Sequence, residues 1–241
     1  MRGTTPEGAR SEQEAAVWVR GMFGRVAHRY DLANHLLSFN IDRYWRARTV
    51  LRVGDILRRP GSRVLDICCG TGDLMQALQR GKASEPPVLG SDFCHPMLLA
   101  AGAKGSGQRL FEGDALQLPV PDASIDLLTV AFGFRNLANY DAGLREMRRV
   151  IRPGGAAAIL EFSQPPNPVF HALYTFYSRR ILPWIGGALS GSRDAYTYLP
   201  ESVRKFPGPA ELADAMRKAG FASVNFELLT GGIVALHVGR V

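Results

Sequence analysis

The chain has 241 residues, of which 46% are hydrophobic and 21% charged, and its formal net charge is +7. This composition suits one large globular domain with a proper core, and the chain has no internal repeat or low-complexity tract. No apolar run approaches the ~20 residues of a membrane-spanning helix, and residues 1–16 lack the apolar stretch of a secretory signal. The three cysteines have no disulfide spacing, which favours a reducing, cytoplasmic compartment. Because there is no CxxC pair and no His/Cys cluster, we expect no metal site.

The basic excess is concentrated at the start of the chain, where residues 1–60 hold eleven arginines and six acidic residues. Such an excess is typical of proteins that bind nucleic acid, an anionic membrane surface or an acidic ligand. Solvated helix faces in an arginine-rich protein would give the same charge. The aromatic residues do not alternate with a basic stripe as base stacking requires, and no N-P-P-[YF]-like motif is present. The sequence therefore argues against a nucleic-acid partner.

The first part of the chain is predicted to be a flexible tail followed by helices. Residues 1–10 are expected to form the tail. Ser11 and Glu14 have the spacing of a capping box, which predicts that a helix begins near residue 11. Two further helices are predicted over 31–38 and 42–59, and a Pro-Gly pair ends the second.

From residue 61 onward, predicted strands alternate with predicted helices. The strands span 63–67, 88–92, 109–114, 124–132 and 156–162, and the helices span 73–80, 96–103 and 141–151. The sequence RPGG at 152–155 predicts a turn into the fifth strand. Alternation of this kind predicts a right-handed, doubly wound parallel sheet.

Residues 165–207 interrupt this alternation. A helix is predicted over 169–184, and a Gly/Ser/Tyr-rich loop is predicted to continue to residue 207. A last helix and two strands joined by a Gly-Gly pair predict an antiparallel hairpin at the end of the sheet. The predicted fold is α/β: a Rossmann-like, doubly wound, mostly parallel seven-stranded sheet with a terminal antiparallel hairpin, an N-terminal helical cap and an inserted helical lid. Its single domain, 11–241, divides into N-terminal helices (11–60), a ligand-binding core (61–164), an insertion (165–207) and a C-terminal helix and hairpin (208–241).

The first junction between strand and helix, VLDICCGTGDL, carries a glycine loop. Gly70 and Gly72 allow a tight turn and close approach of a ligand. A dinucleotide fingerprint needs a third glycine, but that position is Met75. Asp66 and Asp73 suit a cationic group better than a pyrophosphate, and the Lys-Ser/Thr pair of a P-loop is absent. A plain turn without a ligand is the alternative.

The stretch AFGFRN, 131–136, follows a run typical of a buried strand. Arg135 at its end must find an anion, a ring, water or a ligand, because burying an unpaired guanidinium is costly. The open interpretations are a functional cation or a clamp to an acid, such as Asp66 or Asp141, that only orders the loop.

At the strand ends the sequence resembles the class I S-adenosyl-L-methionine (SAM) methyltransferases. The acid and G-x-G loop of their first motif match Asp66, Gly70, Thr71 and Gly72. The resemblance implies that this loop lies against the methionine part of SAM. It also implies that Asp92 binds the ribose hydroxyls and that Asp114 and Ala115 contact adenine.

The segments outside these motifs resemble the UbiE/MenG family, the C-methyltransferases that finish menaquinone and ubiquinone rings. The segments are 30–46, 131–136, 160–165, 195–207 and 229–237, and the resemblance covers about residues 20–241. Two positions depart from the family pattern, because Asn40 and Asp42 stand where members usually have Gly and His. Arg43 and Trp45 of that motif are kept, while any role of the histidine is in doubt.

The resemblance implies ring methylation of a polyprenyl hydroquinone with SAM as cofactor. This chemistry needs aligned reactants and a group that stabilises a developing phenolate, roles that we assign to Arg135 and Asn136. Arg135 can lower the pKa of the phenol or orient a water molecule, and Asn136 can bind a ring oxygen or the SAM carboxylate. Phe132 and Phe134 are candidates to flank cofactor or quinone, and Glu161 to face the acceptor or bind Arg135.

Other assignments each have a structural alternative. Tyr30 and Asn34 are candidates to cover SAM, or to serve as helix caps and surface residues. Tyr196 and Tyr198 are candidates to touch the acceptor or to fill the core. His237 is a candidate proton acceptor, although a lone histidine in a strand is more often structural.

The predicted partners follow from a substrate that lives in a bilayer. Segment 169–185 mixes aromatic and aliphatic residues with two arginines, as an interfacial helix would, so peripheral contact with the inner face of the cytoplasmic membrane is expected. A lid on the core or a homodimer contact are the alternatives. Two other functions remain open: methylation of another small aromatic acceptor, and SAM binding without catalysis.

Overall fold

The computed structural model describes residues 3–6, 8–29, 31, 38–82, 84–105, 109–181 and 193–241. The strands are β1 (Val64–Ile67), β2 (Leu89–Asp92), β3 (Arg109–Glu112), β4 (Ile125–Ala131), β5 (Ile151–Phe162), β6 (Ser223–Leu229) and β7 (Val234–Arg240). The helices are α1 (Glu12–Val26), α3 (Ile41–Arg52), α4 (Gly54–Leu57), α5 (Asp73–Gly81), α6 (His95–Lys104), α7 (Tyr140–Val150), α8 (Pro168–Phe176), α10 (Arg193–Lys205) and α11 (Pro209–Lys218). Short helical turns are η1 (Ala27–Arg29), η2 (Phe134–Asn136), η3 (Tyr177–Ile181) and η4 (Thr230–Gly232).

The seven strands form one sheet in the order β3-β2-β1-β4-β5-β7-β6. β1 to β5 are parallel, and β7 runs antiparallel to both of its neighbours. This confirms the predicted doubly wound sheet with its terminal antiparallel hairpin. Strand order reverses between β1 and β4, and ligands of such sheets bind at the carboxyl ends beside that point.

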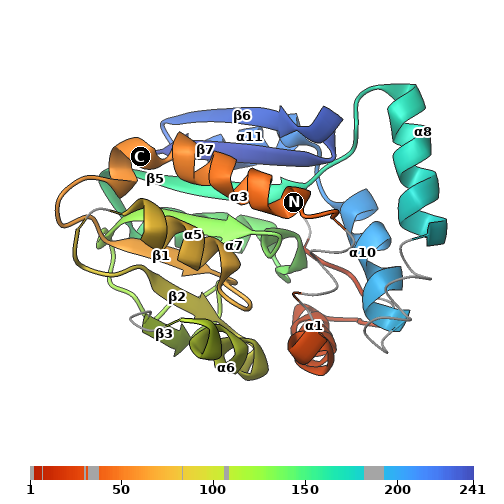
Figure 1. Cartoon of the computed structure of the whole chain (residues 1–241), viewed down its shortest axis with the longest axis horizontal. Helices are drawn as coiled ribbons and strands as arrows, with labels where there is room; N and C mark the ends of the chain where they lie inside the picture. The colour runs from red at the N-terminus through yellow and green to blue at the C-terminus, as the bar shows by residue number, and fades with distance from the viewer. Residues whose placement is uncertain are drawn as a thin grey trace.

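Two hydrophobic clusters cover the faces of the sheet. One packs α7 and α11 against it through residues such as Leu144, Met147 and Met216. The other packs α3, α4 and α5 through residues such as Trp45 and Leu78. Figure 1 shows α1, α8 and α10 gathered at the right-hand end, away from these two layers. Within the described residues, no helix is long and apolar enough to cross a membrane.

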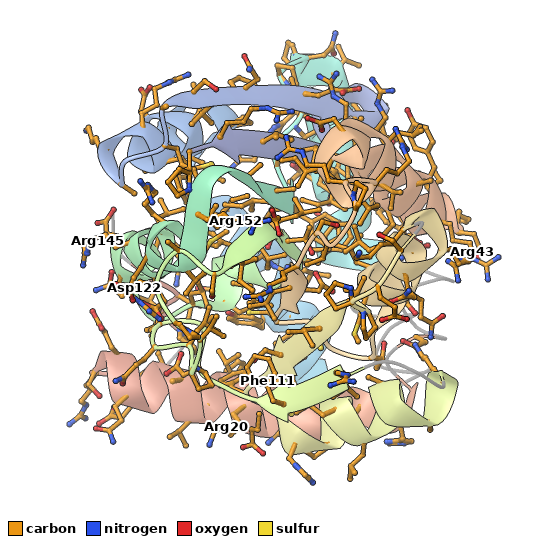
Figure 2. All side chains as sticks on the ribbon, turned by 90° about the vertical axis from the view of Figure 1, so that its left-hand side faces the viewer. Arg20, Arg43, Phe111, Asp122, Arg145 and Arg152 are labelled. Carbon is orange, nitrogen blue, oxygen red and sulfur yellow. The ribbon has the colours of Figure 1, made fainter. Side chains whose placement is uncertain are left out.

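The turn predicted at 152–155 lies inside β5 as an irregularity of the sheet. Ile125 pairs with Ile151, whereas Leu127 pairs with Ala156, so β5 holds the extra residues. Arg152, near the centre of Figure 2, forms an ion pair with the buried Asp126. The backbone of residues 152–155 is therefore held by the strand pairing on both sides of it and by the ion pair of Arg152.

The insertion contains a helix where the sequence predicted a loop. Residues 193–205 form α10 even though Pro200 lies inside it. An interior proline removes a backbone hydrogen bond and disfavours a helix. The helix forms because one of its faces is buried through Tyr198, Ser202 and Val203, with Phe206 directly after it.

Two predictions at the start of the chain also need comment. The helix predicted over 31–38 falls almost wholly outside the described residues, and the one predicted over 42–59 is divided at Val53 into α3 and α4. Residues 3–6 belong to the predicted flexible tail but dock on the domain. The Thr4 amide donates to the Leu137 carbonyl at 2.8 Å, and Thr4 and Pro6 are buried.

A substitution in the β5 irregularity tests how tightly it is packed. A Cβ at Gly155 would lie 2.7 Å from the Asp126 carbonyl oxygen, so we expect Gly155→Ala to lower the free energy of unfolding by about 1–3 kcal/mol. Gly208→Ala is the control, because a Cβ there meets no atom within 4 Å. Denaturant titration measures both. Equal stability of the two variants would contradict the close contact.

Candidate active site

A cavity of about 550 Å³ lies at the carboxyl ends of the parallel strands. This volume is in the range of small-molecule sites. Its walls come from the glycine loop, the ends of β2 and β3, the segment after β4, and helices α1, α3, α8 and α10. One cavity therefore brings together parts of the chain from residue 16 to residue 233.

The glycine loop turns sharply after β1. Cys68, Gly70 and Gly72 all have positive φ, at 49°, 54° and 83°. Gly70 and Thr71 line the cavity, whereas Gly72 is the N-cap of α5 and does not. Burial raises the pKa of the Cys68 thiol, so Cys68 is a poor nucleophile at neutral pH.

Asp92 is the residue that joins this loop to the end of β2. One carboxylate oxygen accepts the Gly70 amide at 2.8 Å, and the other accepts the Cys94 amide at 2.8 Å. Each oxygen keeps a lone pair for a further donor, and Asp92 lines the cavity. A vicinal diol is the kind of ligand that two such fixed oxygens can bind.

Asp66 contributes a second carboxylate to the cavity from the buried strand β1. Its Oδ1 accepts a hydrogen bond from Thr129 at 2.5 Å. Burial raises the pKa of Asp66 to about 7. An ammonium group in the cavity would stabilise the ionised form by opposite charge.

The adenine contacts expected after β3 also lie at the cavity. Asp114 and Ala115 line it, and Asp114 is held by the Leu116 amide at 2.9 Å. Gly113 comes close to the sheet, since a Cβ there would lie 2.9 Å from Ser91 Oγ. A side chain at position 113 would therefore collide with the sheet.

A charged network that the sequence did not predict borders the glycine loop. Arg46 pairs with Asp42 and lies 3.3 Å from Asp73, and Lys104 joins Asp73 to Asp31. Asp42, where the family usually has His, is buried and accepts a hydrogen bond from Ser38. Its role in this chain is to hold Arg46 at the cavity wall. Arg43 of the same motif points outward in Figure 2.

Arg135 lies at the other end of the cavity, in η2 directly after β4. Its Nη1 donates to Glu161 Oε1 at 2.9 Å and to the Phe132 carbonyl, and its backbone amide donates to Glu161 Oε2 at 3.1 Å. The guanidinium lies 5.3 Å from the centroid of Phe162. Of the acids that the sequence offered as partners, Glu161 binds Arg135, and Asp66 and Asp141 do not. Arg135 lines the cavity, but Glu161 does not, so its expected place in the acceptor pocket needs correction: its carboxylate is turned to Arg135.

Asn136 faces the cavity beside Arg135. Its amide nitrogen donates to the Phe132 carbonyl at 3.4 Å, and its oxygen accepts from the Tyr198 hydroxyl at 3.0 Å. Tyr198 lines the cavity too, and burial raises the pKa of its hydroxyl. The hydroxyl therefore remains protonated at neutral pH and can donate to Asn136.

Aromatic rings form another part of the cavity wall, and Arg46 lies 6.0 Å from the centroid of Phe132. Phe132 and Phe162 lie 4.7 Å apart between ring centroids, and Trp45 lies 5.8 Å from Phe132. The expected role of Phe134 needs correction, because its ring is fully buried in the core against Tyr140 and does not reach the cavity. Strand alternation would place Phe132 and Phe134 on the same side, because they are two residues apart. The helical turn η2, which begins at Phe134, breaks that pattern and directs its ring into the core.

Sequence reasoning missed Trp45 and Phe162 as parts of this wall. Trp45 was noted only as a kept motif residue, and Phe162 stood unmarked at the end of the fifth predicted strand. Tyr174 of α8 also lines the cavity, and burial raises its pKa to about 12. An apolar residue at the carboxyl end of a strand can line a cavity instead of the core. Phe162 is the last residue of β5, so its position in the sequence could have indicated this role.

Several predicted residues are not part of the described site. Tyr30 and Asn34 lie outside the described residues, as does the side chain of Tyr196, whose backbone belongs to α10. His237 is not at the cavity: its Nε2 lies 2.8 Å from the Pro209 carbonyl, and burial lowers its pKa to about 4. It is a structural histidine and not the proton acceptor. Within the described ranges, no group of three or more His, Cys, Asp or Glu residues can hold a metal ion.

Comparison with known proteins decides the family. The model of the ubiE/COQ5 methyltransferase family matches residues 9–241. The chain belongs to this family. Demethylmenaquinone methyltransferase of Thermus thermophilus is 48% identical over 90% of this chain and 99% of its own, and that of Deinococcus radiodurans is 46% identical over 95% and 94%. The ubiquinone/menaquinone biosynthesis C-methyltransferase UbiE of Cupriavidus necator is 42% identical over 95% and 94%.

Solved structures show the same fold at lower identity. A SAM-dependent methyltransferase from Thermotoga maritima, described as a possible histamine N-methyltransferase, has a TM-score of 0.64 at 17% identity over 91% of this chain and 98% of its own. The ubiE/COQ5 protein described here is thus a methyltransferase that uses SAM. The residues at the cavity fit that cofactor. The two fixed oxygens of Asp92 can bind a diol, and the Asp66 carboxylate can bind an ammonium group.

The buried carboxylate of Asp66 gives a prediction on stability and on binding. The folded-state pKa of about 7 lies above the ordinary value of about 3.9, so the stability that Asp66 contributes is present at low pH and is lost as pH rises through 7. We expect Asp66→Asn to raise the melting temperature more at pH 8 than at pH 5.5, and to weaken S-adenosylhomocysteine binding at pH 8.

Differential scanning fluorimetry and calorimetric titration at both pH values measure these effects. Asp214→Asn is the control, because the Asp214 side chain is 65% exposed on the outer face of α11. An Asp66→Asn effect that is the same at pH 5.5 and pH 8 would show that Asp66 does not titrate in this range.

Proposed function

We propose that this methyltransferase methylates a ring carbon of a polyprenyl hydroquinone, with demethylmenaquinol as its acceptor in menaquinone biosynthesis. The family and the names of its 48% and 46% identical relatives support this substrate. UbiE of Cupriavidus necator, at 42% identity, supports the corresponding benzoquinol of ubiquinone biosynthesis as a second acceptor. The observation that carries the proposal is a single cavity whose wall combines carboxylates with a buried cation that lies beside aromatic rings.

The acidic end is assigned to the cofactor. Bound SAM supplies an electrophilic methyl group. Asp92 would hold the ribose hydroxyls, Asp66 would favour the ammonium, and Asp114 and Ala115 would face the adenine. Arg46, whose positive charge also acts on Asp66, is the candidate for the carboxylate. Gly70 and Thr71 would border the methionine part.

The aromatic end is assigned to the quinol ring. Ring methylation requires that the phenol lose its proton, which makes the adjacent ring carbon nucleophilic. Arg135 is a permanent cation, so it lowers the pKa of a nearby phenol by opposite charge and stabilises the phenolate that develops. Asn136 would donate to a ring oxygen. Phe132, Phe162 and Trp45 would pack on the faces of the ring and exclude water, which strengthens these interactions.

Methyl transfer from labelled SAM to reduced acceptors tests the proposal. We expect label on a ring carbon of a short-chain demethylmenaquinol, located by mass spectrometry, with a methoxybenzoquinol that lacks the ring methyl offered in parallel. Label on the benzoquinol would instead assign ubiquinone biosynthesis. No label on either acceptor, with cofactor binding intact, would overturn the quinone assignment and favour another small aromatic acceptor or binding without catalysis.

Arg135→Lys tests the role of the guanidinium in the same assay. We expect it to lower kcat by about 100-fold and to leave cofactor affinity within a few-fold, because lysine keeps the charge paired with Glu161 but loses the planar fork. Arg145→Lys is the control, since Arg145 points into solvent on α7 in Figure 2. The loss should be smaller for a quinol with a more acidic phenol. A kcat equal to that of the control would show that Arg135 has only a structural role, in its ion pair with Glu161.

We infer in addition that α8 contacts the membrane that holds the quinol. Val169, Leu173 and Phe176 lie at helical spacing on α8 and are 70%, 63% and 62% exposed. Phe39, 74% exposed, has its ring centroid 6.4 Å from that of Tyr177, which directly follows α8. Leu173, Tyr177 and Phe39 also line the cavity, so the exposed stripe reaches its rim. A tail buried in lipid could therefore enter the cavity from this side, and Figure 1 shows α8 at the outer edge.

Vesicle binding tests this contact with a matched pair of variants. The double variant Val169→Ser, Phe176→Ser removes exposed apolar side chains that do not line the cavity. Val17→Ser, Leu99→Ser is the control, because these residues are 67% and 63% exposed on α1 and α6. We expect co-sedimentation with anionic vesicles to fall about tenfold for the first pair only, since burying two such side chains is worth a few kcal/mol. Equal vesicle binding by the two double variants would contradict membrane contact. If the first double variant loses a dimer but still binds vesicles, the exposed residues of α8 belong to a homodimer contact instead.

A further inference from the structure

The N-terminal residues 3–6, called here the strap, lie against Leu137 and Ala138, which directly follow the turn η2 that carries Arg135 and Asn136. The Thr4 amide donates to the Leu137 carbonyl at 2.8 Å. Gly3 comes so close to Ala138 that a Cβ would lie 1.7 Å from its carbonyl oxygen. Lys205 of α10 donates to the Thr5 carbonyl at 3.1 Å. The strap is thus fixed to both the turn and the insertion, and it lies before residue 9, where the match to the family begins.

A buried chain of hydrogen bonds leads from the strap to the cavity. Thr4 is 7% exposed, and its Oγ1 lies 2.6 Å from the Tyr198 hydroxyl. Tyr198 donates to Asn136 Oδ1 at 3.0 Å. A tyrosine hydroxyl has one hydrogen, so the hydroxyl of Thr4 must donate to Tyr198. The hydrogen bonds therefore run in one direction, from Thr4 to Tyr198 and from Tyr198 to Asn136.

At Asn136 the same direction is supported from a second side, by the Phe132 carbonyl that accepts from the amide nitrogen. Because Oδ1 accepts from Tyr198, the amide nitrogen is directed to the Phe132 carbonyl and the cavity. An amide turned by half a rotation would present an acceptor there instead. A developing phenolate needs a donor, so the productive orientation is the one that Tyr198 selects.

Tyr198 is itself held from several sides. The Trp18 ring of α1 lies 5.0 Å from it between centroids, and Val19 and Met22 of α1 complete a small cluster around it. These contacts fix the position of the ring. Among the described residues, the Thr4 hydroxyl bonds the Tyr198 oxygen and so supports the arrangement in which Tyr198 donates to Asn136.

We infer that Thr4 is a positioning residue for methyl transfer, which acts through Tyr198 to orient the Asn136 amide. The inference rests on the proposed methylation of a quinol. It assigns a role in the reaction to a segment of the chain that the sequence predicted to be a free tail.

Point variants of the full chain test the role. We expect Thr4→Val to lower kcat by about fivefold, the equivalent of one buried hydrogen bond, with KM for SAM unchanged. Thr4→Ser keeps the hydroxyl and should restore most of kcat. Thr5→Val is the matched control, because the Thr5 side chain is exposed and its carbonyl remains. Equal kcat for Thr4→Val and Thr5→Val, or equal losses for Thr4→Val and Thr4→Ser, would overturn the inference.

A double-mutant cycle separates positioning from simple destabilisation. If Thr4 acts through Tyr198, Thr4→Val should have no further effect on kcat in a Tyr198→Phe background. A fivefold loss that persists there would show that the strap acts by another route and would overturn the inference.

Hydrogen exchange provides a readout that does not depend on the acceptor. With S-adenosylhomocysteine bound, amides 133–139 should exchange about fivefold faster in Thr4→Val than in Thr5→Val. If the wild-type protein methylates no quinol, the proposed function fails, yet this difference still tests the coupling of strap to turn. Identical exchange in the two variants would overturn the inference independently of turnover.

Discussion

The buried ion pair between Arg135 and Glu161 is the interaction on which the acceptor end of the site depends. Both side chains are almost inaccessible, at 5% and 1% exposure. Charges at such depth are stable only when they are paired and hydrogen-bonded. Glu161 meets this requirement twice, since it accepts from both the side chain and the backbone of Arg135. The adjacency of β4 and β5 makes the pair possible, because Arg135 follows β4 and Glu161 lies near the end of β5.

The pair also explains why the chain can keep a cation beside an apolar pocket. Phe132 supplies a carbonyl to the guanidinium, and Phe162 supplies a ring face. Both aromatic side chains then line the cavity on the same side as Arg135. The groups that lower the cost of burying the charge therefore also shape the part of the cavity that we propose for the quinol ring. A substitution that removes Arg135 would disturb charge and shape together, which is why lysine is the informative change.

Local sequence patterns predicted the sheet, because strands and helices depend on short segments, and the resemblance to the SAM methyltransferases pointed to acids at its carboxyl edge. Asp92 and Asp114 follow strands, and the ends of parallel strands meet at one edge whatever else the chain does. The side to which Phe134 points was not predictable in this way, since a short helical turn after β4 rotates it into the core. Helix α10 was missed because Pro200 and the nearby glycines are typical of a loop, while its helical state depends on burying Tyr198. The docking of Thr4 was missed because it joins residues 194 positions apart.

The two ends of the cavity also differ in which part of the fold provides them. The doubly wound core supplies the carboxylates and the glycine loop, and these are braced by backbone amides within the core. The proposed acceptor end is lined by residues from elements outside that core, namely Trp45 of α3, Tyr174 of α8 and Tyr198 of α10. Tyr198 is in turn hydrogen-bonded to Thr4 of the strap. Helix α8 has Tyr174 at the cavity, while its Val169 and Phe176 are exposed. In the proposed assignment, the sheet preorganises the cofactor site, and helices outside the core complete the site for the quinol.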